Sequence, residues 1–314
     1  MDNTFKPVLK ASVWMICYNH EKYIAQAIES VLSQVTTFSF DLIIGEDCST
    51  DNTRAICLSY QEKYPQIVKV LAHTTNVGIH KNLILTLNAC KGQYVALLEG
   101  DDYWTDNHKL QKQVDFLDQH NDFVMCYQKT LQINETLGTE KITNENDHAE
   151  TGMEEILSRG WFMRTGSIVF RNGILREFPS WYFDYNSTDY MLHILLAQHG
   201  KIGFLNETTS VYRRHEGGIT KVFESEIITF WKKKLKMLDV IDEYLQFKYS
   251  DSIQILRDQL YHESFTVIMR RPRSLKDVTY LFQILPRLSF KRELGSVYMY
   301  FKRRLSLSHH RKKI

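Results

Sequence analysis

Apolar and polar positions follow two different periods along the first half of the chain. Short continuous apolar runs, typical of strands buried on both faces, alternate with segments whose apolar residues recur at helical spacing. In the first helical segment, Ile24, Ala27, Ile28, Val31 and Leu32 fall on one face. The strands are predicted at residues 12–17, 40–45, 66–72, 94–100 and 123–127, and the helices at 21–34, 51–64, 80–90 and 108–120.

This alternation predicts βαβ units, and therefore an α/β fold with a doubly wound, mostly parallel sheet. The second half is less regular. The sequence predicts a loop or hairpin at 130–148, a short helix at 153–159, a strand at 166–170, an amphipathic helix at 188–199 and a strand pair at 201–215. Beyond residue 220 the pattern is helical, so we expect one domain over 1–220 and a helical C-terminal extension over 221–314.

Polar residues follow each of the first four predicted strands, in the stretches CYNHE, GEDCSTD, AHTTNVG and EGDD. The carboxyl ends of parallel strands meet at one edge of a sheet, where such folds bind ligands. In EGDD, three carboxylates lie within four residues: Glu99, Asp101 and Asp102. A divalent cation, Mg²⁺ or Mn²⁺, would offset their mutual repulsion. Considered alone, a solvated turn before the next helix remains the alternative.

Charge is distributed unevenly along the 314 residues. The net charge is only +2, yet residues 270–314 carry thirteen Lys and Arg against Asp277 and Glu293. With the apolar residues of this tail, the excess predicts contact with an anionic membrane surface; a solvated or oligomer-packing helical tail stays open. The sequence carries no recognition motif for nucleic acid, so none is expected as a partner.

Cysteine usage and the absence of long apolar runs bear on location. The five cysteines form no CxxC pair, which favours reduced thiols and the cytosol. The first residues lack the apolar segment of a signal peptide, and no run of 18 apolar residues exists. We therefore expect a cytoplasmic protein, with attachment to the inner face of the cell membrane through the basic tail.

The order of the polar stretches resembles family 2 glycosyltransferases. The residues that carry the resemblance are CYNHEKYIAQAIESVLSQ, DLIIGEDCSTDNT, TNVGIHKN and KGQYVALLEGDDYW. The match spans roughly residues 10 to 120, with weaker similarity to about His215. It implies a GT-A, Rossmann-like fold, with a nucleotide-binding half at about 8–128 and an acceptor half at about 129–220. It also implies inverting transfer from a nucleotide-sugar, most often a UDP-sugar, with Mg²⁺ or Mn²⁺.

The resemblance assigns site residues in the first half. Asp47 would hold the base, and Asp101 would approach both the ribose and the metal. Glu46, Cys48 and Glu99 stand where the family has Asp, Gly and Asp, so the role of Glu99 stays open. The predicted nucleotide-sugar residues are Cys17, Tyr18, Asn19, Glu21, Glu46, Asp47, Lys81, Asp101, Arg213 and Arg214. The predicted metal ligands are Asp101, Asp102 and His215.

Inverting transfer needs a general base for the acceptor hydroxyl, and the resemblance places it at the start of a helix in the second half. Asp189 is predicted for this role and Asp184 is a weaker candidate; from the residues alone, an acid in a first turn is commonly only a partner of the helix dipole. Residues 213–215 would close over the diphosphate, or form a basic surface turn. Residues 161–167 are expected to shape the acceptor pocket.

Together these features predict a hexosyl- or N-acetylhexosaminyltransferase that modifies a glycan or lipid-linked saccharide in cell-surface polysaccharide synthesis. One alternative is a nucleotidyltransferase, which usually has a glycine-rich phosphate loop after the first strand; CYNHEKY is no such loop. Another is a non-catalytic module that binds nucleotide-sugars or glycans. The acidic residues Asp101, Asp102 and Asp189 argue against that alternative.

Overall fold

The structure is a computed structural model that describes residues 9–144, 148–175, 177–185, 187–218, 227–270 and 275–288. The chain forms two compact units. The first comprises Met1–Ile156 and Trp161–Glu216, and the second Leu157–Gly160 and Gly217–Ile314.

A ten-stranded sheet forms the first unit, in the order β3-β2-β1-β4-β9-β6-β10-β5, with β7 paired to β6 and β8 to β10. The strands β3, β2, β1 and β4 run parallel, as do β6 and β10, whereas β9 runs antiparallel between β4 and β6. The strands are β1 Leu9–Cys17, β2 Ser39–Glu46, β3 Val68–Ala72, β4 Tyr94–Glu99, β5 Tyr103–Trp104, β6 Phe123–Asn134, β7 Thr139–Thr143, β8 Glu150–Thr151, β9 Val169–Arg171 and β10 Lys201–Arg214. The sheet is therefore mostly parallel, as predicted.

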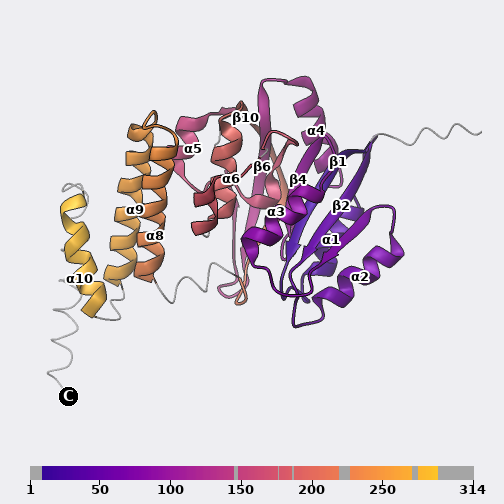
Figure 1. Ribbon diagram of the computed structural model, residues 1–314, viewed down its shortest axis with the longest axis horizontal. Helices are drawn as coiled ribbons and strands as arrows, with labels where there is room; N and C mark the ends of the chain where they lie inside the picture. Colours follow the sequence, from indigo (N-terminus) through magenta and orange to yellow (C-terminus); the bar gives the residue numbers. More distant parts are fainter. Residues whose placement is uncertain are drawn as a thin grey trace, which may run out of the picture. The chain divides into compact units, whose positions relative to one another are not determined.

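Helices cover both faces of this sheet (Figure 1). They are α1 Ile24–Leu32, α2 Thr53–Lys63, α3 Ile79–Ala89, α4 Lys109–Gln119, α5 Met153–Arg159 and α6 Thr188–Ala197, with two 3₁₀ turns, η1 Thr165–Ser167 and η2 Ser180–Asp184. The alternating side chains of β1 show the division. Val13 and Met15 join the core formed with α1, α2 and α4, whereas Trp14 and Ile16 face α3 and α6.

Three sequence expectations for the second half need correction. β10 is one strand and not a pair, because it continues along β6 through register shifts between Leu205 and Ser210. The polar residues 206–208 are exposed and are absorbed as a bulge. The strand expected at 166–170 begins as the 3₁₀ turn η1, and only its end pairs as β9. β6 extends seven residues past the predicted end, and of the loop or hairpin expected at 130–148 the structure shows the hairpin, formed by β6 and β7.

The second unit is helical where it is described, with α8 Ile227–Tyr244, α9 Ser250–Arg270, α10 Leu275–Ile284 and the short turn η4 Leu285–Arg287. Within the described residues, none of the helices combines the length and the apolar character needed to cross a bilayer. Most of the basic tail, including residues 271–274 and 289–314, lies outside the described residues. Membrane attachment and a cytoplasmic location stay predictions.

A buried lysine supports the segment that follows the acidic residues. Lys109 is fully buried in α4, where its ammonium lies 4.5 Å from the centre of the Trp104 ring and donates to Gln113. Burial lowers the pKa of Lys109 to about 7. Trp104 in turn donates from its ring nitrogen to the Gly166 carbonyl at 2.9 Å. The pair therefore joins the acidic loop to η1.

Replacing Lys109 with methionine tests this arrangement. The pKa of Lys109 is about 7 in the folded protein and near 10.5 when unfolded, so the unfolded chain binds more protons between these values. The stability of the native protein therefore rises with pH in that window. Relative to Lys109→Met, we expect the unfolding free energy of the native protein to rise by roughly 2 kcal/mol between pH 7 and pH 9, measured by urea unfolding. If the difference in unfolding free energy between the native protein and Lys109→Met did not change with pH, the ring of Trp104 would be shown to keep Lys109 charged.

Candidate active site

The loops after β1 and β2 are tied together by side chains that the sequence assigned to the nucleotide. Asn19, in the left-handed conformation at φ 57°, accepts a hydrogen bond from the backbone of Thr50 at 2.9 Å. Its own N–H donates to the Ser49 hydroxyl at 3.0 Å. The Glu21 carboxylate accepts from the backbone of Asn52 at 3.0 Å. Asn19 and Glu21 therefore shape this edge of the site through the loops.

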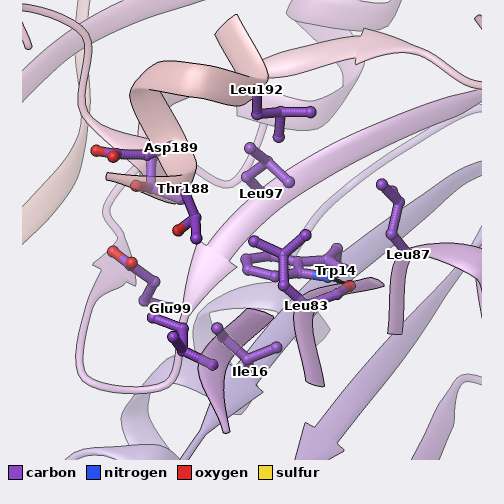
Figure 2. A pocket seen from close by; sticks show the side chains of 11 residues that line it. Trp14, Ile16, Leu83, Leu87, Leu97, Glu99, Thr188, Asp189 and Leu192 are labelled. Carbon is purple, nitrogen blue, oxygen red and sulfur yellow. Dashed lines mark hydrogen bonds between the residues drawn. The ribbon is translucent and has the colours of Figure 1, made fainter. Parts of the chain in front are cut away.

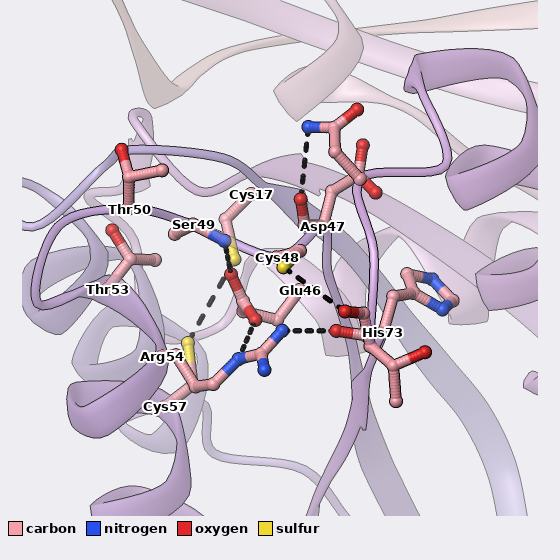
Figure 3. Close-up of polar contacts among 12 residues, drawn as sticks. Cys17, Glu46, Asp47, Cys48, Ser49, Thr50, Thr53, Arg54, Cys57 and His73 are labelled. Carbon is pink, nitrogen blue, oxygen red and sulfur yellow. Dashed lines mark hydrogen bonds and ion pairs between the residues drawn. The ribbon is translucent and has the colours of Figure 1, made fainter.

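Glu46 ends β2 as a fully buried carboxylate (Figure 3). It accepts from the backbone of Ser49 at 2.7 Å and forms an ion pair with Arg54. Arg54 also donates to the carbonyl of His73. Both carboxylate oxygens of Glu46 thus have partners within the protein. Through Arg54 the side chain connects the end of β2 to the end of β3.

Asp47 connects β2 to the loop before α3. Its two carboxylate oxygens accept from the backbone N–H groups of Val77 at 2.7 Å and Gly78 at 3.0 Å. The Asn76 amide donates to the Asp47 carbonyl at 3.1 Å. Each carboxylate oxygen retains a lone pair for a second hydrogen bond. The predicted contact with a base is therefore compatible with the role of Asp47 in the loop.

The remaining predicted nucleotide residues of the first half differ in exposure. Cys17 is buried at the end of β1, with its sulfur 4.0 Å from that of Cys57. Tyr18 is 42% exposed and Lys81 is exposed in the first turn of α3. Tyr18 and Lys81 are therefore accessible to a ligand, whereas the Cys17 side chain is buried in the core that β1 forms with α1, α2 and α4.

The three carboxylates that follow β4 converge. Ligand atoms of Glu99, Asp101 and Asp102 all lie within 4.8 Å of one another. The turn between them requires Gly100, because an added Cβ would lie 2.8 Å from the Cβ of Cys17. Convergent carboxylate oxygens are the ligands that Mg²⁺ and Mn²⁺ prefer. The residues present therefore fit a divalent cation, with Glu99 in the set.

The end of β10 supports this cluster from the side. The backbone N–H of Arg213 donates to Asp102 at 2.8 Å, and its guanidinium donates to the Asp101 carbonyl at 2.6 Å. The same guanidinium lies 4.4 Å from the centre of the Tyr103 ring. In this arrangement Arg213 holds the acidic loop, and its predicted contact with a diphosphate stays a prediction. Arg214 is half-buried, and no further role is assigned to it.

Two histidines approach Asp101. The Nε2 atom of His215 lies 3.0 Å from Asp101 Oδ2, and that of His20 lies 3.8 Å from the same oxygen. His215 therefore meets the cluster through Asp101, and its role as a metal ligand stays a prediction. His20 was not among the predicted site residues, although it lies in the CYNHE stretch. Its position directly after a strand end was the available signal.

Burial and neighbouring charges shift the pKa values of the three carboxyl groups in different directions. Burial, with the charges of Asp101 and Asp189, raises the pKa of Glu99 to about 8. Burial, with the charges of Asp101 and Glu99, also raises the pKa of Asp102. Burial acts in the same direction on Asp101, but the charge of His20 and the hydrogen bond from His215 outweigh it and lower its pKa. The cluster is an unfavourable arrangement for three negative charges without a cation.

Asp189 lies in the first turn of α6 and lines the same pocket as Glu99 (Figure 2). Thr165 lies in the stretch predicted to shape the acceptor pocket, and it also lines this pocket. The fold thus brings the predicted base beside the acidic cluster. Asp184, the weaker candidate for the base, is exposed at the end of η2.

Comparison with known proteins gives the family. The model of glycosyl transferase family 2 matches residues 12–180, more than half of the chain. The chain belongs to this family. The chain also has the GT-A fold expected from the resemblance, with its mostly parallel sheet and helical C-terminal region.

An uncharacterised protein of Mycobacterium tuberculosis is 36% identical over 228 residues, which cover 71% of this chain and 64% of that protein. In fold, the chain resembles residues 1–349 of Staphylococcus aureus TarS in complex with UDP-GlcNAc, with a TM-score of 0.65, 21% identity and coverage of 88% and 79%. A mannosyltransferase from Pyrobaculum calidifontis, in complex with GDP-Man and Mn²⁺, gives a TM-score of 0.55, 13% identity and coverage of 95% and 85%.

The backbone of Cys48 gives a test of the loop that holds Asp47. Cys48 adopts φ 57°, a left-handed conformation that disfavours a side chain other than glycine or asparagine. We expect Cys48→Gly to raise the unfolding free energy by about 1 kcal/mol, measured by urea unfolding. Cys57→Gly, in the interior of α2, is the opposite control and should destabilise. Destabilisation by Cys48→Gly would show that the thiol contact with Thr74 outweighs the backbone strain.

Proposed function

We propose that this glycosyltransferase transfers a sugar from a UDP-sugar to a glycan or lipid-linked saccharide, with inversion, in the synthesis of a cell-surface polysaccharide. The observation that carries the proposal is the placement of Asp189 and Glu99 on one pocket beside the acidic cluster. A candidate base thus lies next to the groups that would hold the diphosphate end of a donor. The UDP-GlcNAc bound to TarS supports the choice of nucleotide.

In the proposed reaction, Asp189 accepts the proton of the acceptor hydroxyl as the oxygen attacks the anomeric carbon. Asp47 accepts a hydrogen bond from the base, and Tyr18 lies against the nucleotide. Asp101 and Asp102, with Glu99, would hold Mg²⁺ or Mn²⁺. When bound, the cation supplies positive charge against the departing diphosphate. His20 and His215 keep Asp101 ionised and oriented.

A non-catalytic nucleotide-sugar module would use the same donor contacts without a base. The two functions differ only in whether an acceptor hydroxyl is activated, so Asp189 separates them. A nucleotidyltransferase would release pyrophosphate from a nucleoside triphosphate, whereas the proposed enzyme releases UDP. Identifying the released product therefore separates the second alternative.

The cation site is tested by thermal unfolding with UDP in the presence and absence of Mn²⁺. A ligand at a hundred times its Kd stabilises the folded state by about 2.7 kcal/mol, so Mn²⁺ with UDP should raise the Tm of the native protein. The double variant Asp101→Asn/Asp102→Asn should lose this shift. Asp122→Asn removes an exposed carboxylate that pairs with Lys201, away from the cluster, and should keep the shift. An equal shift in all three proteins would contradict the assignment of the cation to this cluster.

The base is tested by the kinetics of UDP release with a saccharide acceptor found by screening. Asp189→Asn should lower kcat by roughly 10²–10⁴ while UDP-sugar binding, measured by calorimetry, stays intact. Asp184→Asn is the matched comparison and should keep kcat. The reverse pattern would move the base to Asp184. Full UDP release by both variants would exclude Asp189 and Asp184 as the base.

A further inference from the structure

The pocket beside Glu99 and Asp189 extends away from the acidic cluster, between the sheet and the helices α3 and α6. The empty space of the pocket, counted together with open solvent, is about 390 Å³. In Figure 2 the carboxylates of Glu99 and Asp189 lie at one side, and Trp14, Leu83 and Leu87 lie at the other. The mechanism above uses only the acidic side, so the apolar side needs a separate explanation.

The side of the pocket away from Glu99 and Asp189 is lined by apolar side chains, and Trp14 presents no free hydrogen-bond donor there. Leu97 and Leu192 are buried there with Leu83. Trp14 carries the one side-chain donor of this wall, and its ring nitrogen already donates to the Leu83 carbonyl at 3.1 Å. The indole therefore presents carbon atoms to the cavity. A charged or hydroxylated group placed against this wall would lose its hydration without compensation.

The side next to Glu99 and Asp189 is polar. Thr165 and Thr188 line it together with the two carboxylates, and the Thr165 hydroxyl hydrogen-bonds to Glu99. A group that fits the whole pocket therefore carries hydrogen-bonding atoms close to the reacting centre and a hydrocarbon end beyond them.

We infer that this pocket receives the acetamido group of an N-acetylated donor sugar, with its methyl against Trp14, Leu83 and Leu97. The inference rests on the proposed function, because it needs the donor's sugar ring to lie beside Glu99 and Asp189. An acetamido group has an N–H for a carboxylate, a carbonyl for a threonine hydroxyl and a terminal methyl. A plain hexose hydroxyl lacks the methyl, and a 6-deoxy methyl lacks the polar atoms.

Paired donors that differ only in this group test the inference. Binding of UDP-GlcNAc and UDP-glucose to the full chain is measured by calorimetry with Mn²⁺. Filling an apolar pocket with one carbon group typically changes discrimination by tenfold or more. We therefore expect the native protein to bind UDP-GlcNAc about tenfold or more tightly than UDP-glucose, and Leu83→Phe to abolish most of that preference.

Leu85→Phe is the matched control, because Leu85 lies on the same helix, is 38% exposed and does not line the pocket. It should keep the native preference. If Leu83→Phe fails to fold by circular dichroism, Ile79→Phe gives a second route, since Ile79 is half-buried at the start of α3 and also lines the pocket. It should reduce the preference in the same way.

Two outcomes overturn the inference in distinguishable ways. Equal affinity for the two donors, or a preference that survives in both pocket variants, removes the acetamido site while UDP-sugar binding stands. Failure to bind either UDP-sugar removes the UDP part of the proposed function as well. Loss of preference in Leu85→Phe, to the same degree as in Leu83→Phe, would show an effect of the helix and not of the pocket.

Discussion

Mutual repulsion among Glu99, Asp101 and Asp102 is the constraint on which the site depends. Three carboxyl groups within 4.8 Å of one another at the end of a buried strand cannot all be ionised without compensation. The protein supplies part of this compensation through His20, His215 and the backbone N–H of Arg213. Burial and the neighbouring carboxylates still raise the pKa values of Glu99 and Asp102. A bound cation would supply the remainder.

Many polar residues near the site form hydrogen bonds or ion pairs within the protein itself. Asn19 and Glu21 join two loops, Asp47 holds the loop before α3, and Arg54 neutralises Glu46. These bonds fix the strand ends before any ligand arrives. Groups positioned in advance need no reorganisation when charge develops in the reaction, so the rigidity of this rim is consistent with catalysis as well as with binding.

The two faces of the central sheet have different roles. One face packs α1, α2 and α4 into a continuous apolar core. The other leaves a pocket between Trp14, Leu97 and the helices α3 and α6, with Asp189 at its edge. Because side chains alternate along a strand, one strand such as β1 builds the core with Val13 and Met15 and the pocket with Trp14 and Ile16. Alternate residues of the same strand thus build the core and the candidate specificity site.

The sequence by itself determined the parallel sheet, the rim of polar strand ends and the acidic cluster. The reason is local: strand period, helix period and the polar residue after each strand are all properties of neighbouring positions. The tertiary structure alone decided which distant groups meet. Asp189 and Glu99 line one pocket because residues of α6 and β4 meet there. Arg213 donates a hydrogen bond to Asp101 because β10 continues along β6 as one bulged strand. Such meetings depend on strand order and register across the whole sheet, and no local pattern in the chain encodes them.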